Sequence, residues 1–183
     1  EIVRKGIKTA IEQAYADRRE GSLYLGYGRA DEGMQRDDRL PQVFSDKLTR
    51  IRFVPNDGSR EIYFVNFASH SESLEGKNSL VSADFPAYFR ERIYEKTGAE
   101  TIYFVGAIGG MISMRSHAKT MPEKIEGTKE LGRQLADYAL TIKDEVELKA
   151  NINFIKQEFF VEAENIVLMA AAQLSILHTK KYN

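Results

Sequence analysis

The sequence of 183 residues contains no cysteine and no tryptophan, and only four prolines. The absence of cysteine excludes a disulfide framework and any metal site built from thiolates. Neither sign of charge predominates, because 26 Lys and Arg residues face 27 Asp and Glu residues, for a net charge of −1. A near-neutral chain has no overall field that attracts nucleic acid or anionic lipid, so we expect no nucleic-acid partner.

Long hydrophobic runs are also missing. The most apolar stretch, residues 166–177, is twelve residues long and is interrupted by Gln173 and Ser175. A membrane span needs about 20 apolar residues, so we expect a buried helix here and no transmembrane segment. The chain opens without a methionine or a secretory signal, and both of its ends fall in or beside helical patterns. We therefore interpret it as one domain over residues 1–183 that belongs to a larger protein.

Helix and strand periodicities alternate along the chain, which predicts an α/β fold. A hairpin signal, Asn56-Asp57-Gly58, joins two of the strands and makes the sheet mixed, flanked by helices. The long polar segment 29–46 and the segments 68–81 and 111–122 are expected to be loops. Helices are predicted at 2–19, 82–97, 123–142 and 163–178, and strands at 22–28, 48–54, 61–67, 101–105 and 152–161.

Two strand ends are candidate positions for a site, because ligands of open α/β sheets bind beyond the carboxyl ends of strands. One is the polar loop after Phe67, which contains His70. The other is the glycine-rich turn 106–110, which follows the nearly continuous apolar run 101–105. Such a run is typical of a strand covered on both faces. If the two strands are neighbours, their loops converge.

His70 is the main candidate for chemistry. A histidine just beyond a buried strand suits a metal ligand or a general base, and Glu72 and Asp84 are possible supporting acceptors. The alternative is a hydrogen-bonded structural histidine, which is the commoner role at such a position. The glycine turn lacks the Gly-Lys-Ser or Gly-Lys-Thr of a phosphate loop, since Met111 follows it.

Other polar residues leave alternatives open. Arg36 lies in the segment Gln35-Arg-Asp-Asp-Arg39, where it either joins a surface ion network or clamps a substrate oxygen. Spacing does not decide between these roles. Ser113 and Ser116 lie near His117, but adjacency in sequence says little about a catalytic triad, and solvated loop residues are the better interpretation.

Taken in order, several segments resemble the neutral/alkaline (non-lysosomal) ceramidase family, and most of all the N-terminal domain of bacterial ceramidase-like hydrolases. They are Phe64-Val-Asn-Phe-Ala-Ser-His70, Ser82-Ala-Asp-Phe-Pro-Ala-Tyr88 and Tyr103-Phe-Val-Gly-Ala-Ile-Gly109. The upstream loop from Tyr27 to Arg39 resembles the family's "glycine … asparagine-arginine" loop. The resemblance covers roughly residues 1–160.

The resemblance implies a zinc-dependent amidase that acts on a small-molecule or lipid-like amide. In the family, two histidines, a glutamate and a tyrosine hold the zinc. His70 matches one of these ligands, and the positions of the others fall before residue 1 and after residue 183. Arg36 matches a substrate-facing arginine, and Asp84 matches an aspartate for which we expect a supporting catalytic role. Relatives are often exported or lipid-anchored, which makes the cell envelope a possible location.

The sequence departs from the family at the glycine turn. Family members that cleave ceramide have Gly-Asp-x-Ser-Pro there, whereas this chain has Gly110 at the aspartate position and Ile112 at the serine position. Ser113 lies one position after the place where those family members have their serine. These differences disfavour ceramide as the substrate and disfavour serine-assisted chemistry. Two alternatives to a hydrolase therefore stay open: a non-catalytic relative that serves as a binding or scaffolding module, and an unrelated α/β protein.

Overall fold

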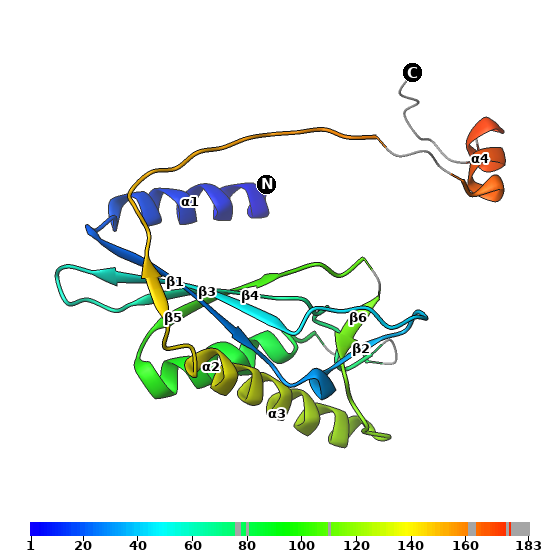
Figure 1. The fold of residues 1–183 in the computed structure, drawn as a ribbon, viewed down its shortest axis with the longest axis horizontal. Coiled ribbons are helices and arrows are strands. Elements are labelled where there is room, and N and C mark those ends of the chain that lie inside the picture. The colour runs from blue at the N-terminus through cyan, green and yellow to red at the C-terminus, as the bar shows by residue number, and fades with distance from the viewer. Residues whose placement is uncertain (76–77, 80, 110, 161–163, 175, 177–183) are drawn as a thin grey trace. The chain divides into compact units, whose positions relative to one another are not determined.

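The computed structural model describes residues 1–75, 78–79, 81–109, 111–160, 164–174 and 176 (Figure 1). The chain divides into two compact units, residues 1–149 and residues 150–183, and each is described by itself. The sheet and three of the helices belong to the first unit. The α/β domain is thus contained in residues 1–149, and its extension to residue 183 stays a prediction.

A mixed sheet of five strands forms the centre of the first unit, in the order β5-β4-β3-β1-β7. Only β4 and β5 run parallel, because a helix connects them, and the other neighbours are antiparallel. The predicted α/β class with a mixed sheet is confirmed. The strands are β1 (Gly21–Arg29), β3 (Lys47–Pro55), β4 (Ile62–Phe67), β5 (Glu100–Val105) and β7 (Glu145–Glu147).

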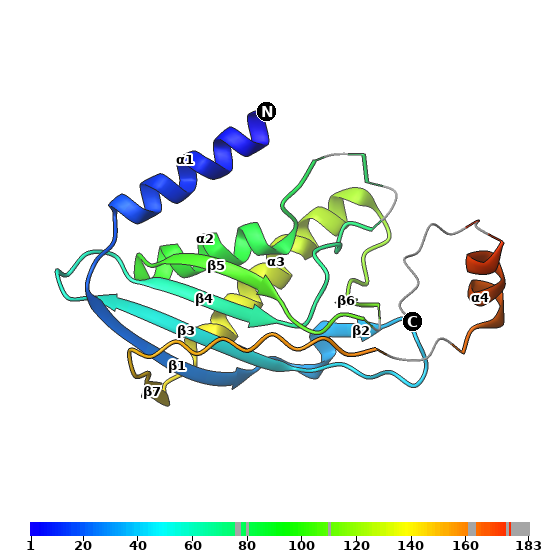
Figure 2. The same ribbon diagram turned by 90° about the horizontal axis from the view of Figure 1, so that it is seen from above.

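Two helices, α2 (Phe85–Thr97) and α3 (Met121–Leu140), pack against each other and cover one face of this sheet (Figure 2). Gly98 ends α2 in the left-handed conformation with φ 74°, directly after the predicted helix 82–97. Thr120 and Glu123 form a reciprocal cap at the start of α3. The core lies between the helices and the sheet and contains fully buried side chains such as Phe67, Phe85, Phe89 and Leu135.

A second, two-stranded sheet joins segments that the sequence analysis expected to be loops. The strands β2 (Gln35–Asp37) and β6 (Ile112–Met114) pair antiparallel, and a short 3₁₀ helix, η1 (Glu32–Met34), precedes β2. The loop prediction is wrong at these positions. Strands of three residues are too short to show a period of two, and their pairing connects residues about 75 positions apart, which local pattern cannot report.

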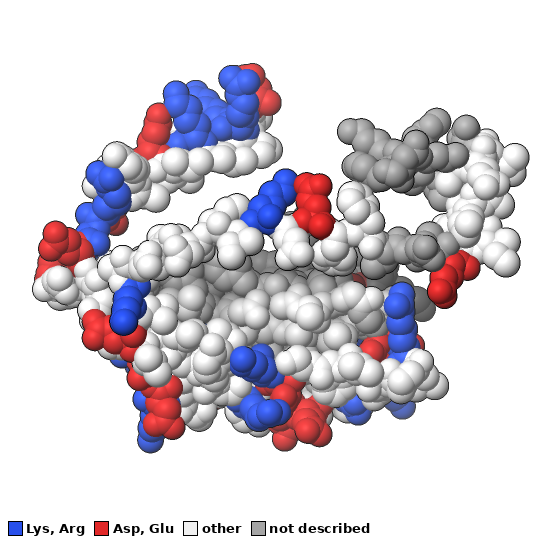
Figure 3. All heavy atoms as spheres, turned by 45° about the horizontal axis from the view of Figure 1, so that its top comes forward, with Lys and Arg blue, Asp and Glu red and all other residues white. Residues whose placement is uncertain are grey.

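Both α2 and α3 lie on the same face of the large sheet, and they leave its other face uncovered (Figure 2). Figure 3 shows few charged side chains over the middle of this face. β5 lies at the edge of the sheet, and its Ile102 and Phe104 are 44% and 48% exposed, so the expectation that this strand is covered on both faces is wrong. By register the uncovered face presents Leu23, Leu25, Tyr27, Ile51, Phe53, Ile62, Phe64, Ile102 and Phe104.

The two terminal helices bury nothing within the described residues. α1 (Ile2–Ala16) has the predicted amphipathic pattern but no buried side chain. In the second unit, α4 (Ile166–Gln173) lies within the predicted helix 163–178, and it too has no buried side chain, contrary to the expectation of a buried helix. Among the helices described, none is long and apolar enough to cross a membrane.

The strand predicted at 152–161 is wrong for residues 152–160, which form neither a helix nor a strand, and residue 161 lies outside the described part. The alternating apolar residues that suggested a strand, such as Ile152 and Phe154, are 95% and 85% exposed. A β-strand requires a partner for its backbone groups, and an alternating pattern alone does not supply one.

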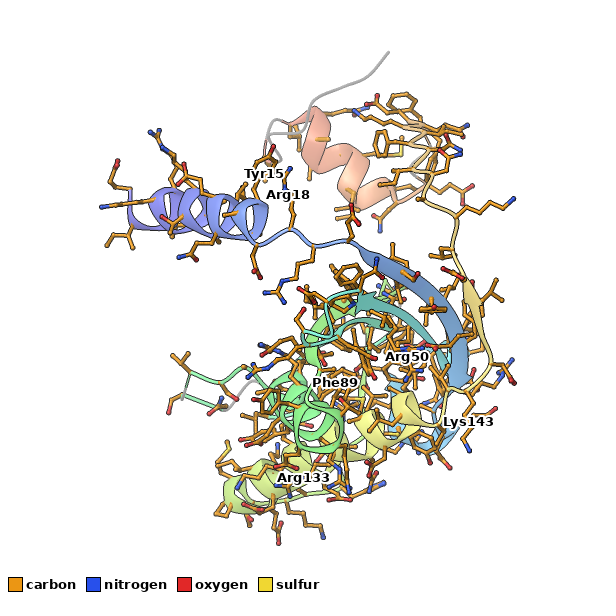
Figure 4. The ribbon with its side chains drawn as sticks, turned by 90° about the vertical axis from the view of Figure 1, so that its left-hand side faces the viewer. Tyr15, Arg18, Arg50, Phe89, Arg133 and Lys143 are labelled. Atoms are coloured by element: carbon orange, nitrogen blue, oxygen red, sulfur yellow. The ribbon has the colours of Figure 1, made fainter. Side chains whose placement is uncertain are left out.

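A buried arginine connects the sheet to the end of α3. Arg50 on β3 is 4% exposed and lies between the sheet and the helices (Figure 4). Its guanidinium donates to the carbonyl oxygens of Ala139 and Ile142, at 2.8 Å each, and to the Glu145 carboxylate at 2.9 Å. Arg52 reaches the same carboxylate at 2.7 Å. This network satisfies the otherwise unpaired carbonyl groups where α3 ends.

The acidic partner of this network is predicted to stabilise the fold in a pH-dependent way. Burial opposes ionisation of Glu145, but the hydrogen bonds and charges of Arg52 and Arg50 outweigh it and lower the pKa of this carboxyl. The stabilisation is therefore complete above the unfolded pKa of about 4.3 and is lost as pH falls through the lower folded pKa. We expect Glu145→Gln to reduce the free energy of unfolding at pH 7 by roughly 2–3 kcal/mol.

Urea denaturation of both proteins at pH 7 and pH 3 tests this, and the difference between them should shrink at the lower pH. Glu147→Gln is the matched control, because Glu147 is exposed and accepts only the Ser22 hydroxyl among the contacts described for its side chain. Equal effects of the two substitutions would contradict the proposed role of the Arg50–Glu145 pair.

A glycine sets the distance between α2 and α3. A Cβ atom at Gly132 would lie 2.5 Å from the Phe85 carbonyl oxygen and 2.9 Å from the Phe89 backbone nitrogen. Both are backbone atoms, which cannot rotate away. We expect Gly132→Ala to lower the free energy of unfolding by about 1–3 kcal/mol despite the better helix propensity of alanine. Gly127→Ala on the same helix is the control, because the nearest atom to its added Cβ would be 3.9 Å away. It should leave the free energy of unfolding unchanged or raise it. Thermal unfolding of both variants measures the difference.

Candidate functional site

Two of the residues that the sequence predicted for the site flank the same serine. Arg36 on β2 is paired with Ser113 on β6, and His70 forms a parallel bridge to the same serine. Paired residues project their side chains to the same face, so Arg36, Ser113 and His70 share one side of this small sheet. The backbone N–H of His70 completes the bridge by donating to the Ile112 carbonyl at 2.9 Å.

The predicted convergence of the two strand ends is confirmed. β4 and β5 are parallel neighbours, and the backbone N–H of Gly106 donates to the Phe67 carbonyl at 2.9 Å. A Cβ atom at Gly106 would lie 3.2 Å from the backbone of Ala68, so the glycine permits this close approach. The glycine-rich turn after β5 therefore runs directly beside the segment that leads to His70.

Side chains hold three consecutive carbonyl groups immediately before His70. The Tyr103 hydroxyl is within hydrogen-bonding distance of the Phe67 and Ser69 carbonyl oxygens, at 3.1 and 3.3 Å. The Gln35 side-chain amide donates to the Ala68 carbonyl between them. Burial raises the pKa of the Tyr103 hydroxyl, so it keeps its proton and remains a donor. The backbone that presents the partly buried His70 is therefore fixed on both sides.

Asp84 fixes the chain just after His70. It precedes α2 and is 4% exposed, with a positive φ of 56°. Its carboxylate accepts from the Ser73 hydroxyl at 2.7 Å, from the Ser73 and Leu74 backbone N–H groups at 3.1 and 3.3 Å, and from the Phe85 N–H at 2.8 Å. These bonds connect the loop that follows His70 to the start of α2. The carboxylate is thus committed to structure and is not presented to solvent.

The same network reaches α3. The hydroxyls of Ser73 and Thr128 are 2.7 Å apart, and Thr128 is buried on α3 one turn before Gly132. The close helix packing that Gly132 permits therefore also brings Thr128 within reach of the loop. Asp84 at the start of α2 and Thr128 on α3 therefore hold the same short segment, residues 73–74.

Charged side chains border His70 and Ser113. Arg36 pairs with Glu75 at 3.4 Å and with Asp38 at 3.6 Å, which matches the ion-network alternative for this arginine. Lys124 on α3 also contacts Glu75, and its hydrogen bond, followed by its charge and that of Arg36, lowers the pKa of the Glu75 carboxyl against a smaller opposing effect of burial. The Ser113 hydroxyl donates to Glu72 at 2.7 Å.

The described residues supply part of a metal site at most. Within the described ranges, no three His, Asp or Glu side chains gather as a metal ion would require. The role of His70 as a metal ligand stays a prediction. Two buried polar atoms, Gln35 Oε1 and Arg36 Nε, have no hydrogen-bond partner among the described residues. Gln35 and Arg36 are consecutive residues of β2, so their side chains project to opposite faces and only Arg36 shares the face of His70.

Sequence reasoning missed several residues that build the site. Tyr103 was noted only within an apolar strand and as the first residue of a family motif, and neither Ser73 nor Thr128 was noted at all. A tyrosine within a run of otherwise apolar strand residues is a usable signal, because a buried hydroxyl needs a partner. Gly110, where the sequence departs from the ceramidase pattern, lies outside the described residues. Ile112, at the serine position of that pattern, is buried in β6.

Comparison with known proteins identifies the fold. No family model and no curated protein matches the chain. Among solved structures, the neutral ceramidase from Pseudomonas aeruginosa superposes with a TM-score of 0.65 at 21% identity, covering 78% of this chain and 26% of that one. A ceramidase complexed with C2 gives a TM-score of 0.61 at 19% identity, with 74% and 24% covered.

The chain therefore has a ceramidase-like α/β fold, as a class of structure. More particularly, the chain has the fold of about a quarter of the neutral ceramidase chain, which supports the resemblance drawn from the motifs. The structural likeness, at this level of identity, concerns the fold alone.

The contacts of the Tyr103 hydroxyl with the carbonyl groups before His70 lead to a testable prediction. Tyr103→Phe removes the hydroxyl and leaves buried carbonyl groups of Phe67 and Ser69 without that partner. We expect the free energy of unfolding to fall by about 1 kcal/mol and the His70 amide to exchange its hydrogen faster. Hydrogen exchange followed by mass spectrometry or NMR measures both effects. Tyr94→Phe, at a tyrosine that is 44% exposed, is the control and should change neither quantity.

Proposed function

We propose that this chain forms part of a zinc-dependent hydrolase that cleaves a linear amide bond, with His70 as one zinc ligand and Arg36 as a substrate-facing residue. The observation that carries the proposal is the pairing of both residues with Ser113, in a domain whose fold is ceramidase-like. Fold likeness alone says little about activity. The match between the motif positions and this juxtaposition is the stronger support.

Each residue has a defined task in this proposal. Zinc, when bound, polarises the amide carbonyl and lowers the pKa of a water molecule, and its other ligands come from outside the described residues. Arg36 donates to the carbonyl oxygen as negative charge develops on it, released from part of its pairing with Glu75. Asp84 acts as a positioning residue, because its bonds to Ser73 and Leu74 hold the loop beyond His70.

The substrate is expected to be a small-molecule or lipid-like N-acyl amide. The solved relatives are ceramidases by their names, but this chain has the buried Ile112 where ceramide-cleaving members carry a serine. The neighbouring Ser113 does not replace it simply, since it is 2% exposed and already donates to Glu72. We therefore propose an amide other than ceramide.

The metal assignment is tested by zinc content. In the intact protein, His70→Ala should reduce bound zinc to less than a tenth of the wild-type stoichiometry, measured by mass spectrometry of the metal, because a zinc site rarely survives the loss of a ligand. Hydrolysis of N-acyl amide substrates should fall at least 100-fold. His117→Ala provides the control, since His117 is exposed and lies outside the pairing of Arg36, Ser113 and His70.

Unchanged zinc in the His70 variant would remove this residue from the metal site. The 183-residue chain alone should bind zinc weakly and show almost no turnover, because it contributes one ligand of four. Tight one-to-one binding by this chain would contradict the assignment of the remaining ligands to segments outside it.

A non-catalytic role is the second candidate, and one observation favours it. The Ser113 hydroxyl is buried and engaged with Glu72, and Arg36 is held by two carboxylates, so the polar groups next to His70 are already paired. Such pairing of the polar side chains is expected of a domain that kept the fold but serves as a binding or scaffolding module. Absence of zinc from both the intact wild type and its His70 variant would support this candidate over the hydrolase.

A further inference from the structure

A groove separate from the His70 site lies along α3, between this helix, η1 and the segment after β6. It encloses about 720 Å³, within the usual range for sites that bind small molecules. Residues around η1, the segment after β6 and α3 form its walls, and Arg36, His70 and Asp84 do not line it. Its apolar side chains are Met34, Leu131 and Tyr138, all three of which pack against the core.

One end of the groove carries positive charge. Arg115, at the end of β6, is partly buried and held in place by two bonds: its backbone N–H donates to the Met34 carbonyl at 2.7 Å, and its Nε donates to the Gln35 carbonyl at 3.1 Å. With Nε engaged, the two terminal amino groups of the guanidinium donate to no partner among the described residues. That end of an arginine matches a carboxylate, which it binds through two parallel hydrogen bonds.

The other charged groups of the groove do not neutralise this arginine. Asp31 accepts the Gly33 backbone N–H, and no ion pair joins it to Arg115 among the described residues. Asp137 is bound by Arg92 at 2.9 Å. His117 lines the groove as a second nitrogen donor and is exposed. A ligand therefore meets one anchored cation beside an apolar floor, in a groove whose walls also carry the carboxylates of Asp31 and Asp137.

We propose that this groove binds a small apolar carboxylate, with the carboxylate on Arg115 and an aromatic or aliphatic body against Met34, Leu131 and Tyr138. The flexible thioether of Met34 and the ring of Tyr138 favour an aromatic group as the apolar part of the ligand. The inference is independent of the zinc chemistry, because it uses no residue of the His70 site.

The test uses 3-phenylpropanoate as the probe and 3-phenylpropanol as its neutral counterpart, each titrated into the ¹⁵N-labelled 183-residue chain. Binding of the carboxylate should shift amide signals of Met34, Arg115 and Leu131, and the alcohol should bind at least tenfold more weakly. Arg115→Gln should weaken carboxylate binding at least tenfold and leave alcohol binding nearly unchanged. The matched control is Arg133→Gln, since Arg133 is exposed on the outer side of α3 and does not line the groove (Figure 4).

Three results would overturn the proposal: no binding of the carboxylate, equal binding of the acid and the alcohol, or equal effects of the Arg115 and Arg133 substitutions. Should Arg115→Gln fail to fold, the amide signals of the wild-type chain that shift during the titration show where the probe binds. Shifts confined to the uncovered sheet face around Phe64 would place the probe there and refute the groove as its site. Shifts at the three groove residues, absent for the alcohol, would support it.

Discussion

The buried carboxylate of Asp84 is the constraint on which the candidate site depends. It accepts four hydrogen bonds from three residues, Ser73, Leu74 and Phe85, and so it ties the loop after His70 to the start of α2. A buried charge is tolerated only when its bonds are complete, so this loop cannot move away without a large penalty. Because Ser73 also meets Thr128, the position of the loop depends on α3 lying close to α2. The glycine at position 132 makes that closeness possible.

The rest of the site follows from the ends of two parallel strands. β4 and β5 deliver the His70 segment and the glycine-rich turn to the same edge, and the small sheet of β2 and β6 then adds Arg36 and Ser113. This arrangement suits a hydrolase whose metal is completed by other parts of a longer protein. It also suits a domain that kept the scaffold after losing the chemistry, and bound zinc is the property that separates the two.

Local pattern predicted much of the fold because its signals are short-range. The strand pair around Asn56-Asp57-Gly58, the helix ending at Gly98 and the strand before Gly106 all follow from periodicity and turn residues. The same reasoning failed where a partner strand decides the outcome. Residues 152–160 alternate like a strand but pair with none, whereas the three residues of β2 show no pattern and pair with β6. The apolar run of β5 was assigned two covered faces, although it lies at an edge.

The sequence by itself determined the α/β class, the mixed sheet and the choice of Arg36, His70 and Asp84 as the residues worth locating. These depend on residue type, spacing and motif order, which are properties of the chain. Only the tertiary structure decided that Arg36 and His70 meet across Ser113, that Asp84 is buried among backbone donors, and that Tyr103 and Gln35 hold the carbonyls before His70. Apart from those of Asp84, these contacts join residues about 30 to 80 positions apart, and they exist because helix packing and strand pairing bury polar groups that must then find partners.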